Sequence, residues 1–265
     1  MFKKIAKMAS LLSPFKGEFG GSANVISAEA LIHAGLVREN NEDSYLILPE
    51  YQCWAVADGM GGCECGEIAS AIAICSLKTA IASGQDLIAA IQYSHHAVEQ
   101  AARDGLGTAG MGSTLVAIQL NNGVYRIAWV GDSRAYLYRS ELKCLTKDHS
   151  YIQLMLDQGL ISDNDIENHP YKNVVTQALG GTDKSITVDM IEGKLQRDDI
   201  FLLCSDGLSG KVSFQGIEQA LSDHNNTLND RANYLVHEAL AAGGEDNITL
   251  ILLEVGTAFS DSFRN

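Results

Sequence analysis

Four acidic clusters, widely separated in this chain, each stand where a predicted β-strand meets a turn. They occupy residues 38–43, 58–62, 205–207 and 245–247. If the strand ends meet in the fold, several carboxylates lie together, and carboxylate oxygens are the hard ligands that Mg²⁺ and Mn²⁺ prefer. Arg38 stands four residues before the pair Glu42-Asp43, and a planar guanidinium suits a phosphate. The clusters together indicate metal-assisted hydrolysis of a phosphoester.

Length and composition favour one domain with a substantial core. The chain has 265 residues, of which 46% are hydrophobic, with only 3 prolines and no Gly/Ser-rich linker. We expect one domain over residues 25–255, between a flexible N-terminal extension at 1–24 and a flexible tail at 256–265. The formal net charge of -14 repels nucleic-acid backbones and anionic membranes. We therefore expect no nucleic-acid partner.

The N-terminal residues are basic and only weakly apolar. Lys7 interrupts the apolar run and Pro14 ends it, so the pattern does not fit a secretory signal. We expect a mobile basic extension, with weak contact to a membrane surface as the alternative. No stretch of the sequence is long and apolar enough to form a transmembrane segment.

Six cysteines are present, an even count that also fits disulfides. Cys53, Cys75 and Cys204 stand in apolar runs, where cysteine behaves as a small hydrophobic residue. We therefore expect reduced thiols and a cytoplasmic protein. Cys63-Glu-Cys65 resembles half of a zinc site, but no second pair accompanies it, which favours a structural loop.

Hydrophobic periodicity predicts strands and helices in separate groups. The predicted strands are 25–34, 43–48, 53–57, 113–120, 124–130, 134–139, 186–191, 200–204 and 248–255. The predicted helices are 67–82, 86–103, 148–159, 214–221 and 229–242, with Asp86 and Asp148 as N-caps. Antiparallel-looking strand groups separated by helical pairs predict a layered α+β fold and argue against a parallel doubly wound sheet.

Three other motifs resemble binding sites but stand in the wrong context. Residues 105–110 match the glycine pattern of dinucleotide sites, yet a helix precedes them and a strand follows, which reverses the required order. Residues 163–167 resemble the start of a calcium loop, but Asn168 replaces the required glycine. His95 and His96 are neighbours on a predicted helix and point in different directions, so we expect no two-histidine metal site there.

Two apolar strands end in Asp-Gly, at Asp58-Gly59 and at Asp206-Gly207. Alone, each dipeptide is most often a turn. Two such strand ends in one chain, with two further acidic pairs available, favour a shared site.

The chain resembles the metal-dependent serine/threonine protein phosphatases of the type 2C family, and most closely their compact bacterial members. The matching motifs follow the family order over nearly the whole chain, and as a set they are specific although each alone is weak. They are GLVRENNED at 35–43, VADGMGG at 56–62, GSTL at 112–115, VGDSR at 130–134, LTKDH at 145–149, QALGG at 177–181, CSDGL at 204–208 and EDNIT at 245–249.

The resemblance implies a central sandwich of two antiparallel β-sheets flanked by α-helix pairs, with two Mn²⁺ or Mg²⁺ ions at one end. By the family pattern, Asp58 bridges the two ions. Asp206 and Asp246 complete the coordination of one ion, and Glu42 and the Gly59 carbonyl serve the other. The implied reaction is attack by a water that the two ions activate, without a covalent phosphoenzyme.

Four further residues have a role by the same resemblance. Arg38 matches the arginine that binds the substrate phosphate, Asp43 supports the metal site through water, and Asn247 lies beside it. Asp132 resembles the ligand of a third, weaker metal. The alternative for Asp132 is a turn residue that pairs with Arg134 at the surface.

Two positions depart from the family pattern. Met60 stands where some members have a histidine that is proposed as the acid for the leaving alcohol, and Cys63 stands where bacterial relatives often have histidine. Neither change removes a proposed metal ligand. Residues 150–177 correspond to the family's variable flap, and their polar sequence predicts a mobile segment that faces the substrate.

We therefore expect a phosphatase that acts on phosphorylated proteins and reverses a cognate serine/threonine kinase. A non-catalytic relative that binds phosphoproteins is disfavoured, because Arg38 and the core ligand residues are all present. A metal-dependent nuclease is disfavoured by the charge of -14 and by the lack of a basic groove signature. Phosphate release from a phosphothreonine peptide, with and without Mn²⁺, distinguishes the three functions.

Overall fold

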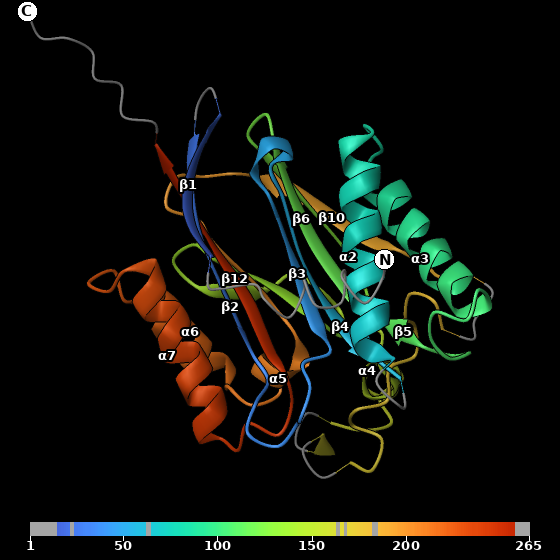
Figure 1. Cartoon of the computed structure of the whole chain (residues 1–265). Coiled ribbons are helices and arrows are strands. Elements are labelled where there is room, and N and C mark those ends of the chain that lie inside the picture. The colour runs from blue at the N-terminus through green and yellow to red at the C-terminus, as the bar shows by residue number, and fades with distance from the viewer. Residues whose placement is uncertain are drawn as a thin grey trace, which may run out of the picture.

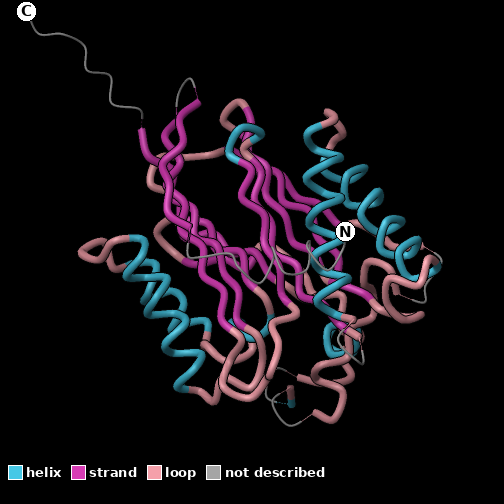
Figure 2. Tube along the Cα trace, viewed as in Figure 1, coloured by secondary structure: helices cyan, strands magenta, loops and turns pink. Residues whose placement is uncertain are grey.

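The computed structural model describes residues 15–21, 24–61, 65–162, 165–166, 169–181 and 185–257. Two antiparallel β-sheets lie face to face, and pairs of helices cover their outer faces (Figure 1). In Figure 2 the strands form the inner layers and the long helices lie outside them. The predicted α+β sandwich with flanking helix pairs is confirmed.

Each sheet is built from antiparallel neighbours. The first sheet contains β1 (Phe15–Gly21), β2 (Asn24–His33), β8 (Arg134–Tyr138), β9 (Leu142–Cys144), β11 (Ile200–Cys204) and β12 (Ile248–Thr257). The second contains β3 (Asp43–Leu48), β4 (Cys53–Met60), β5 (Gly112–Ser113), β6 (Leu115–Asn121), β7 (Val124–Val130) and β10 (Asp189–Lys194). The strand orders are β1-β2-β12-β11-β8-β9 and β10-β7-β6-β4-β3, with β5 paired to the end of β4.

The helices divide between the two outer faces and one end of the sandwich. The pair α2 (Gly66–Ala82) and α3 (Leu87–Arg103) covers the second sheet, and α6 (Phe214–Ser222) and α7 (Leu228–Ala241) cover the first (Figure 1). The short helices α4 (Tyr151–Asp157) and α5 (Asp206–Ser209) lie at the lower end in that view, and a 3-10 turn, η1, spans Pro49–Tyr51.

The burial of strand β4 explains why Asp58 stands out in the sequence after an apolar run. Trp54 and Val56 face the core between the sheets, whereas Ala55 and Ala57 face the core under α2 and α3. All four side chains are fully buried. Because both faces of the strand are covered, its residues are apolar without alternation, and Asp58 interrupts the run.

Two predicted elements begin three residues later in the structure than expected. The cap of α4 is Ser150, whose side chain accepts from Gln153 N, and Asp148 instead binds Arg134. Strand β10 begins at Asp189, later than the predicted residue 186, because the amide of Thr187 donates to the side chain of Gln177 and not to a strand.

Some expectations for the termini and cysteines also need revision. Strand β1 lies inside the expected flexible extension 1–24 and pairs in register with β2, and β12 extends to residue 257. Cys53 and Cys204 are fully buried, but Cys75 is exposed on α2, so its place in an apolar run did not predict burial. No disulfide joins the five cysteines within the described ranges, and Cys63 lies outside these ranges.

A candidate metal centre at the strand ends

Asp58 is held firmly inside β4, two residues before the strand ends at Met60. Antiparallel pairing with β3 places it opposite Asp43. On its other side, Thr114 N donates to Asp58 O at 2.8 Å, and Asp58 N donates to Thr114 Oγ1 at 3.0 Å. Ser113 Oγ also donates to the Asp58 carbonyl, at 3.1 Å. The carboxylate of Asp58 is therefore positioned by the sheet and not by a loose turn.

Asp206 approaches Asp58 from the opposite sheet, because it follows β11 after a single residue, Ser205, as the first residue of α5. Desolvation by burial, followed by the charges of Asp43 and Asp206, raises the pKa of Asp58 well above its ordinary value. Burial and the charge of Asp246 raise the pKa of Asp206, against an opposing hydrogen bond with Asp58. Asp206 Oδ1 is buried and has no hydrogen-bond partner in the described part of the chain. These carboxyl groups therefore repel one another when ionised.

Asp43, the first residue of β3, is only 4% exposed. Its Oδ2 accepts from Ser205 Oγ at 2.8 Å, whereas its buried Oδ1 has no partner within the described ranges. Burial raises the pKa of Asp43 to about 7, although the hydroxyls of Thr249 and Ser205 oppose the shift. Asp43 is thus a buried member of the cluster. This position is compatible with the expected role of supporting the metal site through water.

Glu42 and Gly59 meet at the start of α2. Gly59 N donates to Glu42 O at 3.1 Å. Gly66, the first residue of α2, lies against both groups, since a Cβ on it would stand 2.5 Å from Glu42 Oε2 and 2.7 Å from Gly59 O. Only glycine leaves room for the carboxylate and the carbonyl to converge there. Gly66 was not singled out in the sequence, where it follows the Cys63-Glu-Cys65 segment.

Arg38 lies at the mouth of the cluster and binds Asp246. Its Nη2 donates to Asp246 Oδ2 at 2.9 Å, and the two side chains are 54% and 37% exposed. The pKa of Arg38 is raised, chiefly by this hydrogen bond and the charge of Asp246. A guanidinium has five N–H donors, so the pair leaves others available for an anion.

Asn247 fixes the loop that carries Arg38 and Glu42. Its Nδ2 donates to the carbonyls of Ala34 and Asn40, each at 2.9 Å, and its Oδ1 accepts from Glu42 N at 2.8 Å. The residue is 5% exposed. Because both ends of this amide are engaged by backbone groups, Asn247 positions Glu42 and is not itself placed as a ligand.

Asp132 occupies the turn between β7 and β8. Burial raises its pKa to about 7, and the charges of Asp206 and Asp148 add to the shift. Arg134 is committed elsewhere, because its Nε and Nη2 donate to Asp148 at 2.9 and 2.7 Å. A surface pair between Asp132 and Arg134 is therefore not what the structure shows, and Asp132 instead lies within electrostatic reach of Asp206.

Thr114 connects the two acidic turns, which sequence reasoning did not anticipate. Its Oγ1 accepts from Asp58 N and lies 2.7 Å from Ser133 Oγ, next to Asp132. Thr114 and Ser133 are each 1% exposed. The available signal was a pair of hydroxyl residues in the motif at 112–115, immediately before an apolar strand.

The cluster fits hard divalent cations. Its donors are carboxylate and carbonyl oxygens, the ligands that Mn²⁺ and Mg²⁺ prefer. Two of the buried oxygens, on Asp43 and Asp206, have no hydrogen-bond donor in the described structure. Burial of several carboxyl groups raises their pKa values, and bound cations would offset that cost.

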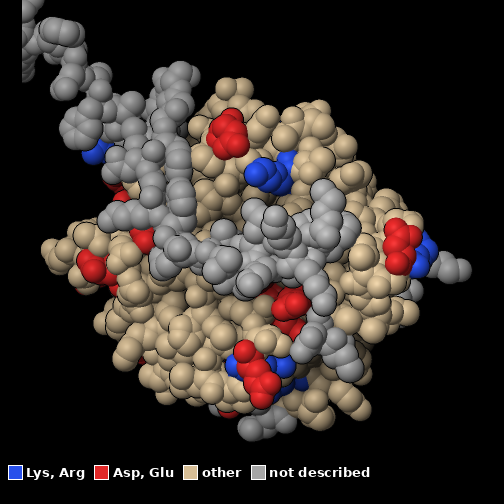
Figure 3. Space-filling view, in the orientation of Figure 1, with Lys and Arg blue, Asp and Glu red and all other residues tan. Residues whose placement is uncertain are grey.

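The charge distribution does not favour a polyanion as substrate. On the face in Figure 3, the coloured basic side chains stand singly or beside acidic ones and form no continuous basic patch in the part that is described. Arg38 itself is paired with Asp246, and Lys211 with Glu245 at 2.6 Å. In the described residues, no helix has the length and apolar character needed to cross a membrane.

Comparison with known proteins finds similar phosphatases over most of the chain. A family model described as protein phosphatase 2C matches residues 32–242, so Asp246 and Asn247 follow the matched range. The chain is 36% identical over 241 residues to the serine/threonine phosphatase stp of Listeria innocua, across 86% of this chain and 95% of the relative. It is also 36% identical over 228 residues to PstP of Mycobacterium tuberculosis, across 83% of this chain and 43% of that longer protein.

Solved structures show the same fold. The M. tuberculosis serine/threonine phosphatase PstP/Ppp superposes with a TM-score of 0.80 at 34% identity, over 87% of this chain and 99% of that one. Stp1 from Staphylococcus aureus gives 0.81 at 29% identity, over 92% and 99%. The PstP catalytic domain in complex with 2 manganese ions gives 0.77 at 34% identity, over 89% and 100%.

Proposed function

Because the chain belongs to the protein phosphatase 2C family, it is a metal-dependent phosphatase of phosphoserine and phosphothreonine in proteins, and we propose that the acidic cluster at the strand ends carries out the reaction. The observation that supports this assignment is the meeting of Asp58 and Asp206, from opposite sheets, with raised pKa values and an unpartnered buried oxygen. Carboxylates in this state are suited to bind cations.

We assign the two ions, Mn²⁺ or Mg²⁺, to two halves of the cluster. Asp58, Asp206 and Asp246 would hold one ion, and Asp58, Glu42 and the Gly59 carbonyl would hold the other. When bound, the ions lower the pKa of a water and so supply the nucleophile at neutral pH. Asp132 would hold a third, weaker metal, a role supported by its burial and by the effect of the Asp206 charge on its pKa.

The remaining residues orient the substrate and the ligands. Arg38 directs its spare N–H donors at the phosphate and so stabilises the negative charge that spreads over the phosphoryl oxygens in the transition state. Asn247 holds the Glu42 loop, and Ser205 holds Asp43. Met60 carries no titratable proton, so the leaving alkoxide takes its proton from solvent or from a neighbouring acid.

The reaction is tested by phosphate release from a phosphothreonine peptide by the full chain. We expect turnover with added Mn²⁺ or Mg²⁺ and none after chelation, because oxygen ligands hold these ions less tightly than thiolate and imidazole sites hold zinc. Turnover in a metal-stripped enzyme would overturn the assignment. Metal binding without turnover would instead support a non-catalytic phosphoprotein binder.

Three finer assignments belong to the same proposal. A cognate serine/threonine kinase would supply the substrates, and the acidic composition and reduced cysteines favour the cytoplasm. Residues 25–255 form the phosphatase domain, and β1, from the expected extension, adds an edge strand to it by pairing with β2. Limited proteolysis with mass mapping tests these bounds, and cleavage between residues 25 and 255 ahead of the ends would contradict them.

A further inference from the structure

His149 ends the motif at 145–149, and its ring binds the turn that carries Asp132. Gly131 N donates to His149 Nδ1 at 3.2 Å, and His149 N donates to Gly131 O at 2.9 Å. The side chain of His149 is only 9% exposed. One histidine therefore binds both backbone groups of the residue that precedes Asp132.

Gly131 depends on such contacts, because it has no side chain to hold it in place. Its φ is +105°, in the region that favours glycine, and a Cβ there would stand 2.6 Å from Thr114 Cγ2. Glycine has more backbone freedom than any other residue, so a turn through it keeps one shape only where neighbouring groups bind it. The position of Asp132, the next residue, is set by this turn.

The ring of His149 is held in one orientation and one tautomer. Because Gly131 N–H donates to Nδ1, the neutral ring carries its proton on Nε2. Nε2 lies 3.3 Å from Asp189 Oδ2, a carboxylate oxygen that accepts from it. Asp189 stands opposite Trp129 in the β7–β10 pair, and the Trp129 ring stacks on His149 with the ring centroids 6.4 Å apart. Both ring nitrogens and one ring face are thus engaged.

We propose that His149, oriented by Asp189, is a positioning residue that sets the place of the Asp132 carboxylate and so the affinity for the third metal. Hydrogen-bond partners behind a metal ligand commonly tune the affinity of the site in this way. In the described structure, no hydrogen bond or ion pair joins His149 to a residue assigned to the two core ions. The effect on the metal rests on the proposed function, whereas the contact with Gly131 does not.

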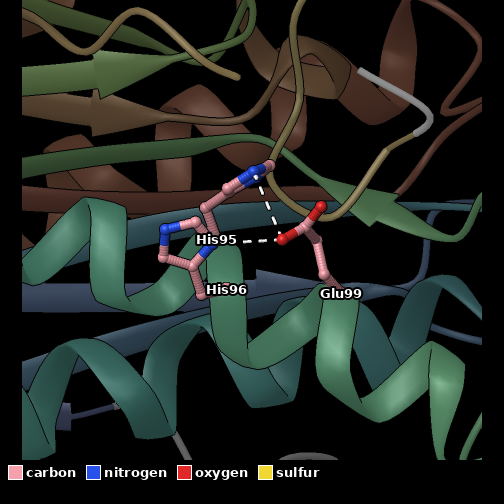
Figure 4. Close-up of side chains that lie close together, drawn as sticks. All are labelled: His95, His96 and Glu99. Atoms are coloured by element: carbon pink, nitrogen blue, oxygen red, sulfur yellow. Dashed lines mark hydrogen bonds and ion pairs between the residues drawn. The ribbon is translucent and has the colours of Figure 1, made fainter. Parts of the chain in front are cut away.

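His95, on α3, is a second buried histidine that accepts from a glycine, since Gly180 N donates to its Nδ1 at 3.0 Å. Its Nε2 therefore carries the proton, and Glu99 Oε2, at 3.8 Å, is too far away for a hydrogen bond. Figure 4 shows His95 and His96 both approaching this carboxylate, so the expectation that the two rings point in different directions was wrong. The protonated Nε2 does not fit a cation. His149 differs in having a carboxylate within hydrogen-bond distance.

The backbone of His149 also closes the base of the segment 150–177. Thr176 N donates to His149 O at 2.8 Å, and Ser150 forms a β-bridge with Val175. These contacts do not involve the imidazole and remain possible in any side-chain variant. A substitution of His149 therefore tests the ring alone.

The inference is tested first by Mn²⁺ titration of the turnover of a phosphothreonine peptide by the full chain. His149→Leu removes the acceptor for Gly131 N–H, so kcat should fall and the Mn²⁺ concentration for half-maximal activity should rise, on the order of tenfold each. KM for the peptide should not change. His149→Asn can place an amide oxygen where Nδ1 stands, so it should restore most of both losses. His237→Leu, at an exposed histidine of α7, is the control.

A double-variant cycle distinguishes positioning from a general loss of stability. In the Asp132→Ala background, His149→Leu should not shift the Mn²⁺ curve further, because the group that it positions is gone. Asp189→Ala, at a side chain that is 45% exposed, should shift the curve in the same direction by less and without opening a cavity in the core. An equal shift in both backgrounds, or a lower kcat with an unmoved Mn²⁺ curve in His149→Leu, would overturn the role.

Nuclear magnetic resonance of the metal-free protein separates this inference from the proposed function. The ¹⁵N signals of His149 should show a protonated Nε2 and a bare Nδ1. The Gly131 N–H should exchange with solvent faster in His149→Leu than in the wild type and in His149→Asn. Equal exchange in all three proteins overturns the inference even if the chain hydrolyses the peptide. If turnover is absent, calorimetric Mn²⁺ binding replaces the kinetics, and a His149→Leu isotherm identical to that of the wild type overturns it.

Discussion

At the scale of the residue, the guanidinium of Arg38 is expected to bind two groups. Its guanidinium binds Asp246 in the structure and is proposed to bind the substrate phosphate as well. Arg38→Ala should raise KM and lower kcat/KM by about 10- to 160-fold, the equivalent of about 1.5–3 kcal/mol for a charged hydrogen bond. Steady-state kinetics with a phosphopeptide measures this. Arg126→Ala, which removes an exposed arginine paired with Glu192, should leave both constants unchanged.

Asp206 and Asp246 are expected to be required for turnover. Asp206→Asn or Asp246→Asn removes charge from one metal half with little change of volume, so kcat should fall about 100-fold or more. Glu245→Gln is the control, since Glu245 is adjacent to Asp246 but its side chain is 67% exposed and bound to Lys211. Wild-type turnover in a purified Asp206→Asn enzyme would place the metal site elsewhere.

Asp132 should behave differently from these core ligands. Asp132→Ala weakens a third metal while two ions remain, so kcat should fall and the Mn²⁺ concentration for half-maximal activity should rise, on the order of tenfold each. A Mn²⁺ titration of activity checks this, with Asp148→Asn as a comparison that breaks the Arg134 pair. An Asp132→Ala enzyme with the wild-type titration curve would reduce Asp132 to a turn residue.

At the scale of the element, the first turn of α2 shapes half of the metal centre. Gly66→Ala would push a methyl group against Glu42 Oε2 and Gly59 O. We expect Mn²⁺ affinity to drop on the order of 10- to 100-fold while the helix persists, because alanine is a good helix former. Calorimetric titration measures the affinity. Gly216→Ala, in α6 and remote from the acidic residues, should leave Mn²⁺ binding unchanged.

At the scale of the whole molecule, the acidic cluster makes the metal-free protein sensitive to pH. The pKa values of Asp43 and Asp132 are each about 7, against about 3.9 in an unfolded chain. Because the folded values are raised, these groups contribute stability that is complete below about pH 4 and lost as the pH rises to about 7.

The metal-free protein should therefore melt at a lower temperature at pH 7.5 than at pH 5, by an amount on the order of 5 °C. Mn²⁺ should restore the loss at pH 7.5, because it binds the ionised form of the folded state. Differential scanning calorimetry measures both effects. Asp206→Asn should show a smaller decrease, and a melting temperature that rises over this pH range in the metal-free wild type would contradict the prediction.

The sequence by itself determined the elements and the chemistry of the ligands. Strand β4 is buried on both faces, so its apolar run is visible in the sequence and Asp58 marks the end of that run. The same local reasoning located β11 and Asp206, and oxygen donors indicated a hard cation. These features depend on side-chain chemistry and on neighbours close in the chain, which is why they could be predicted without coordinates.

Only the tertiary structure decided which groups share an environment. Gly66 belongs beside Glu42 because α2 packs against the end of β4, and Asn247 clamps a loop about 200 residues earlier in the chain. Arg134 binds Asp148 and not Asp132, and which carboxylate it binds depends on distances across a turn. The hydrogen bond from Gly180 N to Nδ1 fixes the ring of His95, and Nε2 of that ring has no hydrogen-bond partner in the described structure. Burial and partner choice are properties of the assembled layers, and the pKa shifts that follow from them are not encoded locally.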